Sequence, residues 1–284
     1  MIYAPECDVC FMHIPKNAGQ SIRNALARRT SLSFDALARD LNVTLAEAEA
    51  ATEAGFDHAT LGPIKPEHLP LATIEVHFPH VWDVLRQTRV FALARDPRDR
   101  FISALLQRMR EFAGSGAIRA DEPEVNEEAA KVCAWLEGNR ASLDLDYIHF
   151  MPQHMYVAHA GQRLVQTLFP MHAMRGLEAW LNQEAGLDLS VSHDHARRQP
   201  KTWAKRLQPA ARFAGHKLMP AALRRALHPI WVRSGVFSDA ARGYDRIDLG
   251  DETERFIADF YKADFALFEE AQTFARAWTP DGRT

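Results

Sequence analysis

Two short polar segments, each directly after an apolar run, constrain the fold of this chain more than any other feature. Residues 11–22 read FMHIPKNAGQSI, and residues 95–103 read RDPRDRFIS. Each segment leads from a strand-like run into an amphipathic helix and places cationic and hydroxyl side chains at the turn. The first N–H groups of a helix have no intrahelical acceptor, so such turns bind anions. Two of them in one chain predict a ligand with two separated phosphate groups.

Apolar runs that alternate with amphipathic segments indicate the fold class. Strands are expected at residues 9–14, 71–76, 90–94 and 163–169, and helices at 21–29, 34–41, 98–112, 171–184 and 252–278. A capping box at Thr44 and Glu47 starts another helix, Pro79 opens one, and a loop at 114–124 precedes a helix through Trp135. This order predicts an α/β fold, with three α/β/α layers around a mostly parallel central sheet.

The charge of the chain is nearly balanced overall but uneven along the sequence. The formal net charge is −3 over 284 residues, which gives no general attraction to nucleic acid. Residues 196–246 nevertheless hold twelve Lys and Arg against two Asp and no Glu. We expect a single domain over 1–284 with a basic helical insertion at about 196–246, which either faces an acidic substrate or is a solvated surface.

Cysteine usage and hydropathy indicate a cytoplasmic protein. Cys7, Cys10 and Cys133 are too few for a disulfide framework, which suggests a reducing compartment. The Cys7-x-x-Cys10 pair lacks a second pair or a histidine cluster at zinc spacing, so no metal is expected and Cys10 is predicted to be a buried strand residue. Neither a signal-peptide pattern nor an apolar run long enough to cross a membrane occurs.

The first polar segment has the chemistry of a phosphate loop. Lys16 lies between a strand end and Gly19, where the backbone can curl around an anion, and Ser21 adds a hydroxyl. The loop that binds ATP or GTP has its lysine directly after a glycine. Here Lys16 comes three residues before Gly19, which argues against an ordinary nucleotide triphosphatase.

The pattern His-Ile-Pro-Lys-x-Ala-Gly-x-Ser resembles the 5′-phosphosulfate loop of sulfotransferases that use 3′-phosphoadenylyl sulfate (PAPS), especially their carbohydrate branch. The resemblance implies a P-loop-nucleotide-kinase-like fold in which Lys16 stabilises the transferred sulfate and no metal is needed. It also implies that the 5′-phosphate is held by Lys16, Asn17, Ala18, Gly19, Gln20 and Ser21. Gln20 stands where a threonine is more usual in this family.

The second polar segment resembles the 3′-phosphate site of the same family, Arg-x-Pro-x-x-Arg-x-x-Ser. A guanidinium at the end of a strand and a hydroxyl one or two turns into the next helix can converge on one phosphate. By this resemblance Arg95 and Ser103 hold the 3′-phosphate. Arg100 points elsewhere on the helix and is expected to pack or pair nearby.

A hydroxyl acceptor needs a base, and histidine suits that role near pH 7. His77 follows the strand expected at 71–76, and its His-x-Pro context resembles the element that carries the catalytic histidine in many sulfotransferases. His80 could share the site and His58 is a rival, whereas His13 is expected to brace the first loop.

Weaker similarities to the family continue downstream. Met151-Pro152-Gln153 resembles an Arg-Pro-Gln element, and residues 261–268 resemble a closing helix that we expect to serve core packing. In the basic segment, Trp203 or Trp231 could be sugar platforms, or both could be ordinary core residues.

The resemblance thus predicts transfer of a sulfuryl group from PAPS to a hydroxyl of a carbohydrate or glycan. Two alternatives remain open, a nucleotide-kinase-like phosphotransferase and a non-catalytic binder of nucleotide or glycan.

Overall fold

The computed structural model describes residues 1–112, 123–140, 142–191, 198–200, 237–239 and 247–278. The chain separates into two units, Met1–Ser192 with Ile247–Thr284, and His193–Arg246. In the second unit, β9 (Arg198–Pro200) pairs antiparallel with β10 (Phe237–Asp239). The rest of the basic segment, including Trp203 and Trp231, lies outside the described residues, as does most of the loop expected at 114–124.

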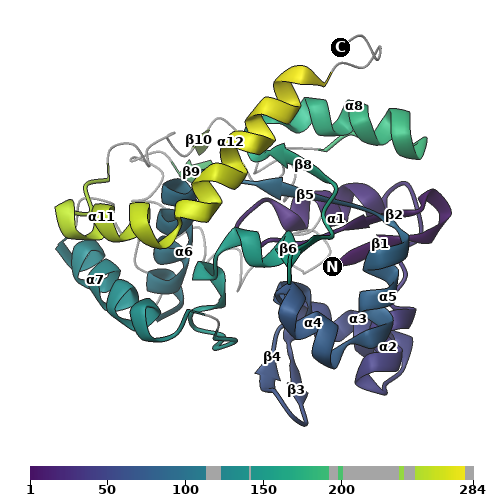
Figure 1. Ribbon diagram of the computed structural model, residues 1–284, viewed down its shortest axis with the longest axis horizontal. Coiled ribbons are helices and arrows are strands. Elements are labelled where there is room, and N and C mark those ends of the chain that lie inside the picture. Colours follow the sequence, from purple (N-terminus) through teal and green to yellow (C-terminus); the bar gives the residue numbers. More distant parts are fainter. Residues whose placement is uncertain (113–122, 141, 192–197, 201–236, 240–246, 279–284) are drawn as a thin grey trace, which may run out of the picture. The chain divides into compact units, whose positions relative to one another are not determined.

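A four-stranded sheet forms the centre of the first unit (Figure 1). Its order is β1-β2-β5-β8, from the strands β1 (Ile2–Ala4), β2 (Val9–Phe11), β5 (Arg89–Ala94) and β8 (Thr167–Pro170). The edge strand β1 runs antiparallel to β2, and the other two pairings are parallel. The prediction of an α/β fold with a mostly parallel sheet is therefore confirmed.

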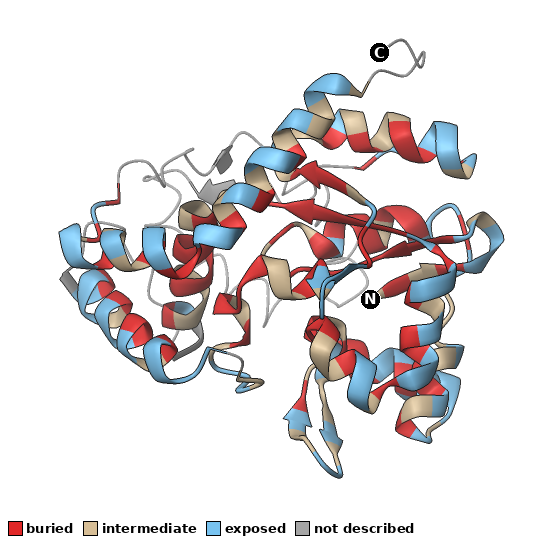
Figure 2. Cartoon of the chain, in the orientation of Figure 1, coloured by how far each residue is buried: buried red, intermediate tan, exposed pale blue. Residues whose placement is uncertain are grey.

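Both faces of this sheet are buried, as the red strands in Figure 2 show. On one face Phe11, Phe91 and Phe169 form a hydrophobic cluster with α1 (Gly19–Ala27) and α8 (Met174–Ala185). Residues that point to the other face, such as Cys10, Ala92 and Leu168, are also buried. Burial on both faces is the normal condition of a parallel sheet, and it explains why β2 and β5 are continuous apolar runs in the sequence. It also confirms that Cys10 is a buried strand residue.

Most helices lie where the sequence predicts them. The elements that agree are α1, α2 (Asp35–Leu41), α3 (Leu45–Ala54), α5 (Pro79–Gln87), α6 (Pro97–Phe112), α7 (Pro123–Gly138) and α8. The capping box of α3 is complete, because the Thr44 hydroxyl accepts from the Glu47 N–H and the Glu47 carboxylate accepts from the Thr44 N–H. Local capping and apolar periodicity were sufficient to predict these elements.

Two expectations about the type or number of elements were wrong. Residues 71–76 belong to a helix, α4 (Leu71–His77), in which Leu71 and Ile74 are buried at a helical spacing while Val76 is 70% exposed. The closing helix is two helices, α11 (Asp251–Phe260) and α12 (Lys262–Ala277), separated at Tyr261. The buried Tyr261 hydroxyl donates to the Phe150 carbonyl oxygen at 2.6 Å, a tertiary contact that sequence periodicity does not contain.

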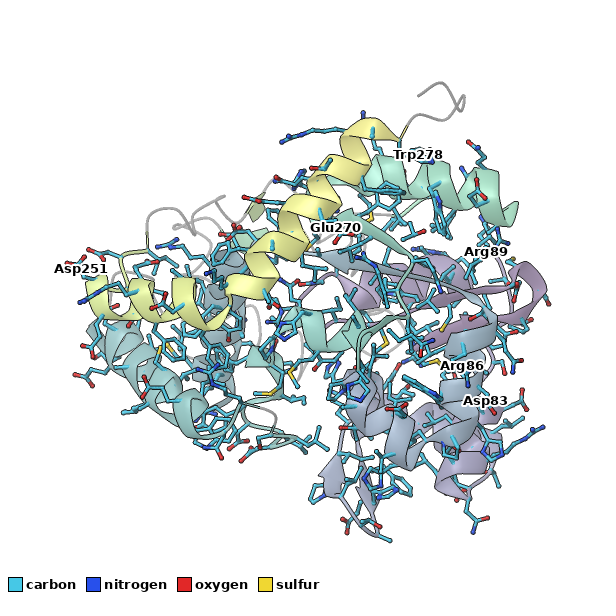
Figure 3. The ribbon with its side chains drawn as sticks, viewed as in Figure 1. Asp83, Arg86, Arg89, Asp251, Glu270 and Trp278 are labelled. Carbon is cyan, nitrogen blue, oxygen red and sulfur yellow. The ribbon has the colours of Figure 1, made fainter. Side chains whose placement is uncertain are left out.

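Short elements complete the unit. Two hairpins pair β3 (Phe56–His58) with β4 (Gly62–Ile64), and β6 (Ala158–His159) with β7 (Gln162–Arg163). The 3-10 helices are η1 (Pro5–Cys7), η2 (Pro66–His68), η3 (Ile148–Phe150), η4 (Gln153–Tyr156) and η5 (Met171–Ala173). Arg163 forms an ion pair with Glu270 of α12, with 2.7 Å between Nη1 and Oε1. Glu270 is labelled in Figure 3. The strand expected at 163–169 thus begins later, because Arg163 belongs to β7.

The three cysteines are free thiols, and burial raises the pKa of both Cys10 and Cys133 to about 12. No helix within the described ranges is long and apolar enough to cross a membrane.

Candidate functional site

The first anion loop, residues 15–21, connects β2 to α1 through an unusual backbone. Lys16 and Ala18 both adopt left-handed conformations, with φ angles of 71° and 58°. Such conformations are costly for residues other than glycine and gather at functional sites. Helix α1 begins at Gly19, so helix geometry leaves the amides of Gly19 and Gln20 without intrahelical acceptors. The loop therefore has the backbone form of an anion-binding nest.

The side chain of Asn17 supports the loop from inside. It is completely buried, and its Nδ2 donates to the Leu93 carbonyl oxygen at 2.7 Å and to Gln153 Oε1 at 2.6 Å. The Asn17 N–H is used as well, since it donates to the Ile14 carbonyl oxygen at 3.3 Å, so this residue shapes the loop from within. Because Leu93 lies on β5, this side chain also ties the first loop to the neighbouring strand.

The second anion loop, residues 95–103, connects β5 to α6. Asp96 caps that helix, since its Oδ1 accepts from the Asp99 N–H at 3.0 Å. The guanidinium of Arg95 reaches the first loop, where Nη1 donates to the Lys16 carbonyl oxygen at 3.2 Å. Arg95 and Ser103 are both buried. The two predicted phosphate turns therefore meet at the carboxyl ends of adjacent parallel strands, the usual ligand edge of an α/β sheet.

Gln153 bridges the two anion loops. In addition to accepting from Asn17, its Oε1 accepts from the Arg95 N–H at 3.0 Å, and its Nε2 donates to the Arg95 carbonyl oxygen at 2.8 Å. Its own N–H donates to the buried carboxylate of Asp264 on α12 at 2.6 Å. The Met-Pro-Gln similarity pointed to this residue, but its bridging role is visible only in the structure.

The remaining side chains of the two loops divide between exposed and internal positions. Lys16 Nζ donates to Gln107 Oε1 on α6, and Gln20 is exposed and donates to Asn24 at 2.9 Å. Ser21 is buried. Arg100 is buried as well, with Nε donating to the Pro15 carbonyl oxygen at 3.0 Å and Nη2 to that of Met151 at 2.6 Å.

These contacts confirm two predictions about internal packing. Arg100 holds the backbone of the first loop against the segment that follows η3, as a packing residue. Tyr261 and Asp264 of the closing segment are buried and bond to the backbone of residues 150–154, so that segment serves the core.

The structure places His77 differently from the prediction. His77 ends helix α4 instead of following a strand, and its ring lies edge-on to that of His58 with 5.9 Å between centroids. His80 lies in the first turn of α5, where its Nδ1 is 2.6 Å from Asp40 Oδ1. The premise that selected His77, a position directly after a strand, was therefore wrong.

Three other histidines lie beside the first loop. The centroid of the His68 ring is 4.8 Å from that of His13 and 5.3 Å from that of His149. A Cβ atom on Gly19 would come within 1.8 Å of His13 Nε2, so the His13 ring packs directly against the start of α1. This contact confirms that His13 braces the loop. His68 and His149 were missed, because no local motif marks them in the sequence.

Glu67 lies between two of these rings. Its Oε2 is 3.4 Å from His13 Nδ1, and its Oε1 is 3.5 Å from His68 Nε2. Burial lowers the pKa of His13, and burial together with its histidine neighbours lowers that of His68 well below the usual range. Burial opposes ionisation of Glu67, but its interaction with His13 and the charge of Lys65 lower its pKa overall. The surroundings therefore disfavour the charged form of both imidazoles and favour the charged form of the carboxyl group.

His149 is the third histidine beside the first loop. Burial lowers its pKa to about 3, and the positive charges of Lys16, Lys65 and Arg100 contribute in the same direction. Lys16, Lys65 and Arg100 therefore all place positive charge near His149.

Comparisons with protein-family models, with curated proteins and with solved structures return no match to this chain. The interpretation of the site therefore depends on its own geometry and chemistry.

Proposed function

We propose that this protein transfers a sulfuryl group from PAPS to a hydroxyl group, with a carbohydrate or glycan as the acceptor. The observation that supports the proposal is the meeting of two anion loops, where Arg95 Nη1 donates to the carbonyl oxygen of Lys16. A nucleotide with phosphates at both its 5′ and 3′ ends needs two such loops side by side. The proposal includes a three-layer, P-loop-nucleotide-kinase-like fold for the first unit.

In this proposal the Asn17–Ser21 turn holds the 5′-phosphate, with the Gly19 and Gln20 amides as its donors, and Arg95 with Ser103 holds the 3′-phosphate. The acceptor oxygen attacks sulfur while the bond between sulfur and the 5′-phosphate oxygen breaks. Adenosine 3′,5′-bisphosphate leaves with the bonding electron pair, and the acceptor proton passes to a base or to water. Lys16 supplies positive charge to the leaving oxygen. By analogy with phosphoryl transfer, positioning and charge stabilisation provide most of the rate.

The identity of the catalytic base is a separate part of the proposal. His77 remains the base implied by the resemblance, although its place at the end of α4 gives it no geometric support. Replacement of His77 by Gln therefore tests that assignment directly. A loss in kcat of about 100-fold or more would support it, and a change below about 3-fold would remove it.

The decisive experiment is calorimetric titration with adenosine 3′,5′-bisphosphate, with AMP, and with ATP in the presence of Mg²⁺. Preference for the bisphosphate supports the proposal and justifies a screen of carbohydrate acceptors with PAPS. Preference for ATP with Mg²⁺ overturns it in favour of a nucleotide-kinase-like phosphotransferase. Tight binding of the bisphosphate without transfer to any acceptor would instead identify a non-catalytic binder.

A further inference from the structure

The group of Glu67 with two histidines has a geometry that the proposed sulfuryl transfer does not use. Among the described residues, one ligand atom each from His13, Glu67 and His68 lies within 4.8 Å of the other two. His13 follows β2, whereas Glu67 and His68 belong to η2. The fold thus brings together donors that are more than fifty residues apart in the sequence.

Two contacts within this group have the length expected between ligands of one metal ion. They join Glu67 Oε2 to His13 Nδ1 at 3.4 Å and Glu67 Oε1 to His68 Nε2 at 3.5 Å, one through each carboxylate oxygen. For an ion about 2.0–2.1 Å from each atom, these separations correspond to ligand–metal–ligand angles of roughly 110–120°. That range is close to tetrahedral.

Unsatisfied nitrogen atoms provide a second, independent observation. Within the described part of the chain, Nδ1 of His13 and Nδ1 of His68 are buried and have no hydrogen-bond partner. The two residues are only 8% and 5% exposed. Buried polar atoms are nearly always satisfied, so such an exception indicates a place for a ligand. His13 Nδ1 is the atom that faces Glu67, whereas His68 faces Glu67 through Nε2, so this observation supports the site at His13.

We propose that His13, Glu67 and His68 bind one divalent transition-metal ion, for which Zn²⁺ is the best fit, beneath the first anion loop. Two imidazoles and one carboxylate form a donor set typical of zinc sites that keep a fourth position open. Mg²⁺ prefers oxygen ligands and does not suit this set. Since the His13 ring packs against Gly19, the ion would link η2 to the start of α1 and hold the loop in place.

An ion pair with Arg23 is the competing explanation for the position of the Glu67 carboxylate. Its Nη1 lies 3.9 Å from Glu67 Oε2, but the same nitrogen donates to Thr52 Oγ1 at 2.8 Å, and Nη2 lies 3.6 Å from Glu53. The Arg23 contact with Glu67 is therefore the longest of the three. If Glu67 served only this ion pair, the cluster would bind no metal.

The test uses the full chain after treatment with EDTA and removal of the chelator. Calorimetric titration with Zn²⁺ should show one site per chain, and Co²⁺ should give the visible absorption of a tetrahedral nitrogen and oxygen site. His68→Asn should weaken Zn²⁺ binding by roughly 100-fold. His159→Asn is the matched control, because His159 Nε2 lies 3.0 Å from Glu75 Oε2 outside this group, and it should leave binding unchanged.

Three results would overturn the proposal: no stoichiometric Zn²⁺ binding, equal binding by the His68 variant, or preference for Mg²⁺. If His68→Asn does not fold, Glu67→Gln replaces it, because that substitution preserves shape while removing the charged ligand. A Zn²⁺-dependent rise in the Tm of the unmodified protein provides a measurement that needs no variant. The titration contains no nucleotide, so its outcome is independent of whether the bisphosphate binds.

Discussion

The two candidate anion loops, residues 15–21 and 95–103, are built from different parts of the backbone and side chains. Both connect a parallel strand to a helix at one edge of the sheet. The first uses backbone amides, with left-handed residues at Lys16 and Ala18 and the Asn17 side chain turned inward. The second begins its helix with an Asp96 cap and offers the guanidinium of Arg95. Substitutions in the first loop should therefore act mainly through shape and stability, and those in the second through charge and affinity.

The largest effect is expected from Gly19→Ala, which tests the shape of the first loop. The added methyl carbon would lie 1.8 Å from His13 Nε2, so either the ring or the helix must move. We expect a loss of about 3 kcal/mol or more in the free energy of unfolding, measured by chemical denaturation. Gly138→Ala is the control, because nothing lies within 4 Å of its added carbon, and it should not destabilise. Equal stability of the two variants would contradict the packing of His13 on Gly19.

Gln153→Leu tests whether one side chain holds both loops together. The substitution leaves the buried N–H and carbonyl oxygen of Arg95 without the partners they have now. We expect a loss of about 2–3 kcal/mol in the free energy of unfolding. The exposed Gln183 on α8 provides the control substitution Gln183→Leu, for which the change should stay below about 0.5 kcal/mol. A similar small change for Gln153 would mean that the loops are held independently.

Arg95→Ala tests the charge-based character of the second loop. Loss of a charge-assisted bond should cost roughly 1.5–3 kcal/mol, or about 10- to 150-fold in the affinity for adenosine 3′,5′-bisphosphate. Affinity for AMP should change little, because AMP has no 3′-phosphate. Arg163→Ala, which removes a surface pair with Glu270, should affect neither ligand. Equal losses for both ligands would refute the role of Arg95.

The smallest effect is expected from Ala18→Gly, in the left-handed part of the first loop. Glycine relieves the cost of a φ of 58° but adds freedom to the unfolded chain, so the two terms should cancel to within about 0.5 kcal/mol. The same change at the exposed helical residue Ala50 should lower the free energy of unfolding by about 1 kcal/mol. Comparable losses at both positions would argue against a left-handed Ala18.

Part of this architecture could be predicted because its signals are local. The buried runs of β2 and β5, the capping box of α3 and the Asp-Pro start of α6 depend on neighbours within a few residues. Residues 71–76 were predicted wrongly because a short apolar segment fits both a strand and a helix. Burial of Leu71 together with Ile74 favours the helix. The break at Tyr261, whose hydroxyl donates to the Phe150 carbonyl oxygen, likewise has no local signal in the sequence.

The sequence by itself determined where the two anion loops lie along the chain and that a mostly parallel sheet presents them. Only the tertiary structure decided that Gln153 bridges them, that His77 ends a helix, and that His13, Glu67 and His68 meet. The reason is physical. Capping, turn geometry and apolar periodicity are short-range properties, whereas a bridging side chain or a three-residue ligand group depends on distances between segments that only packing brings together.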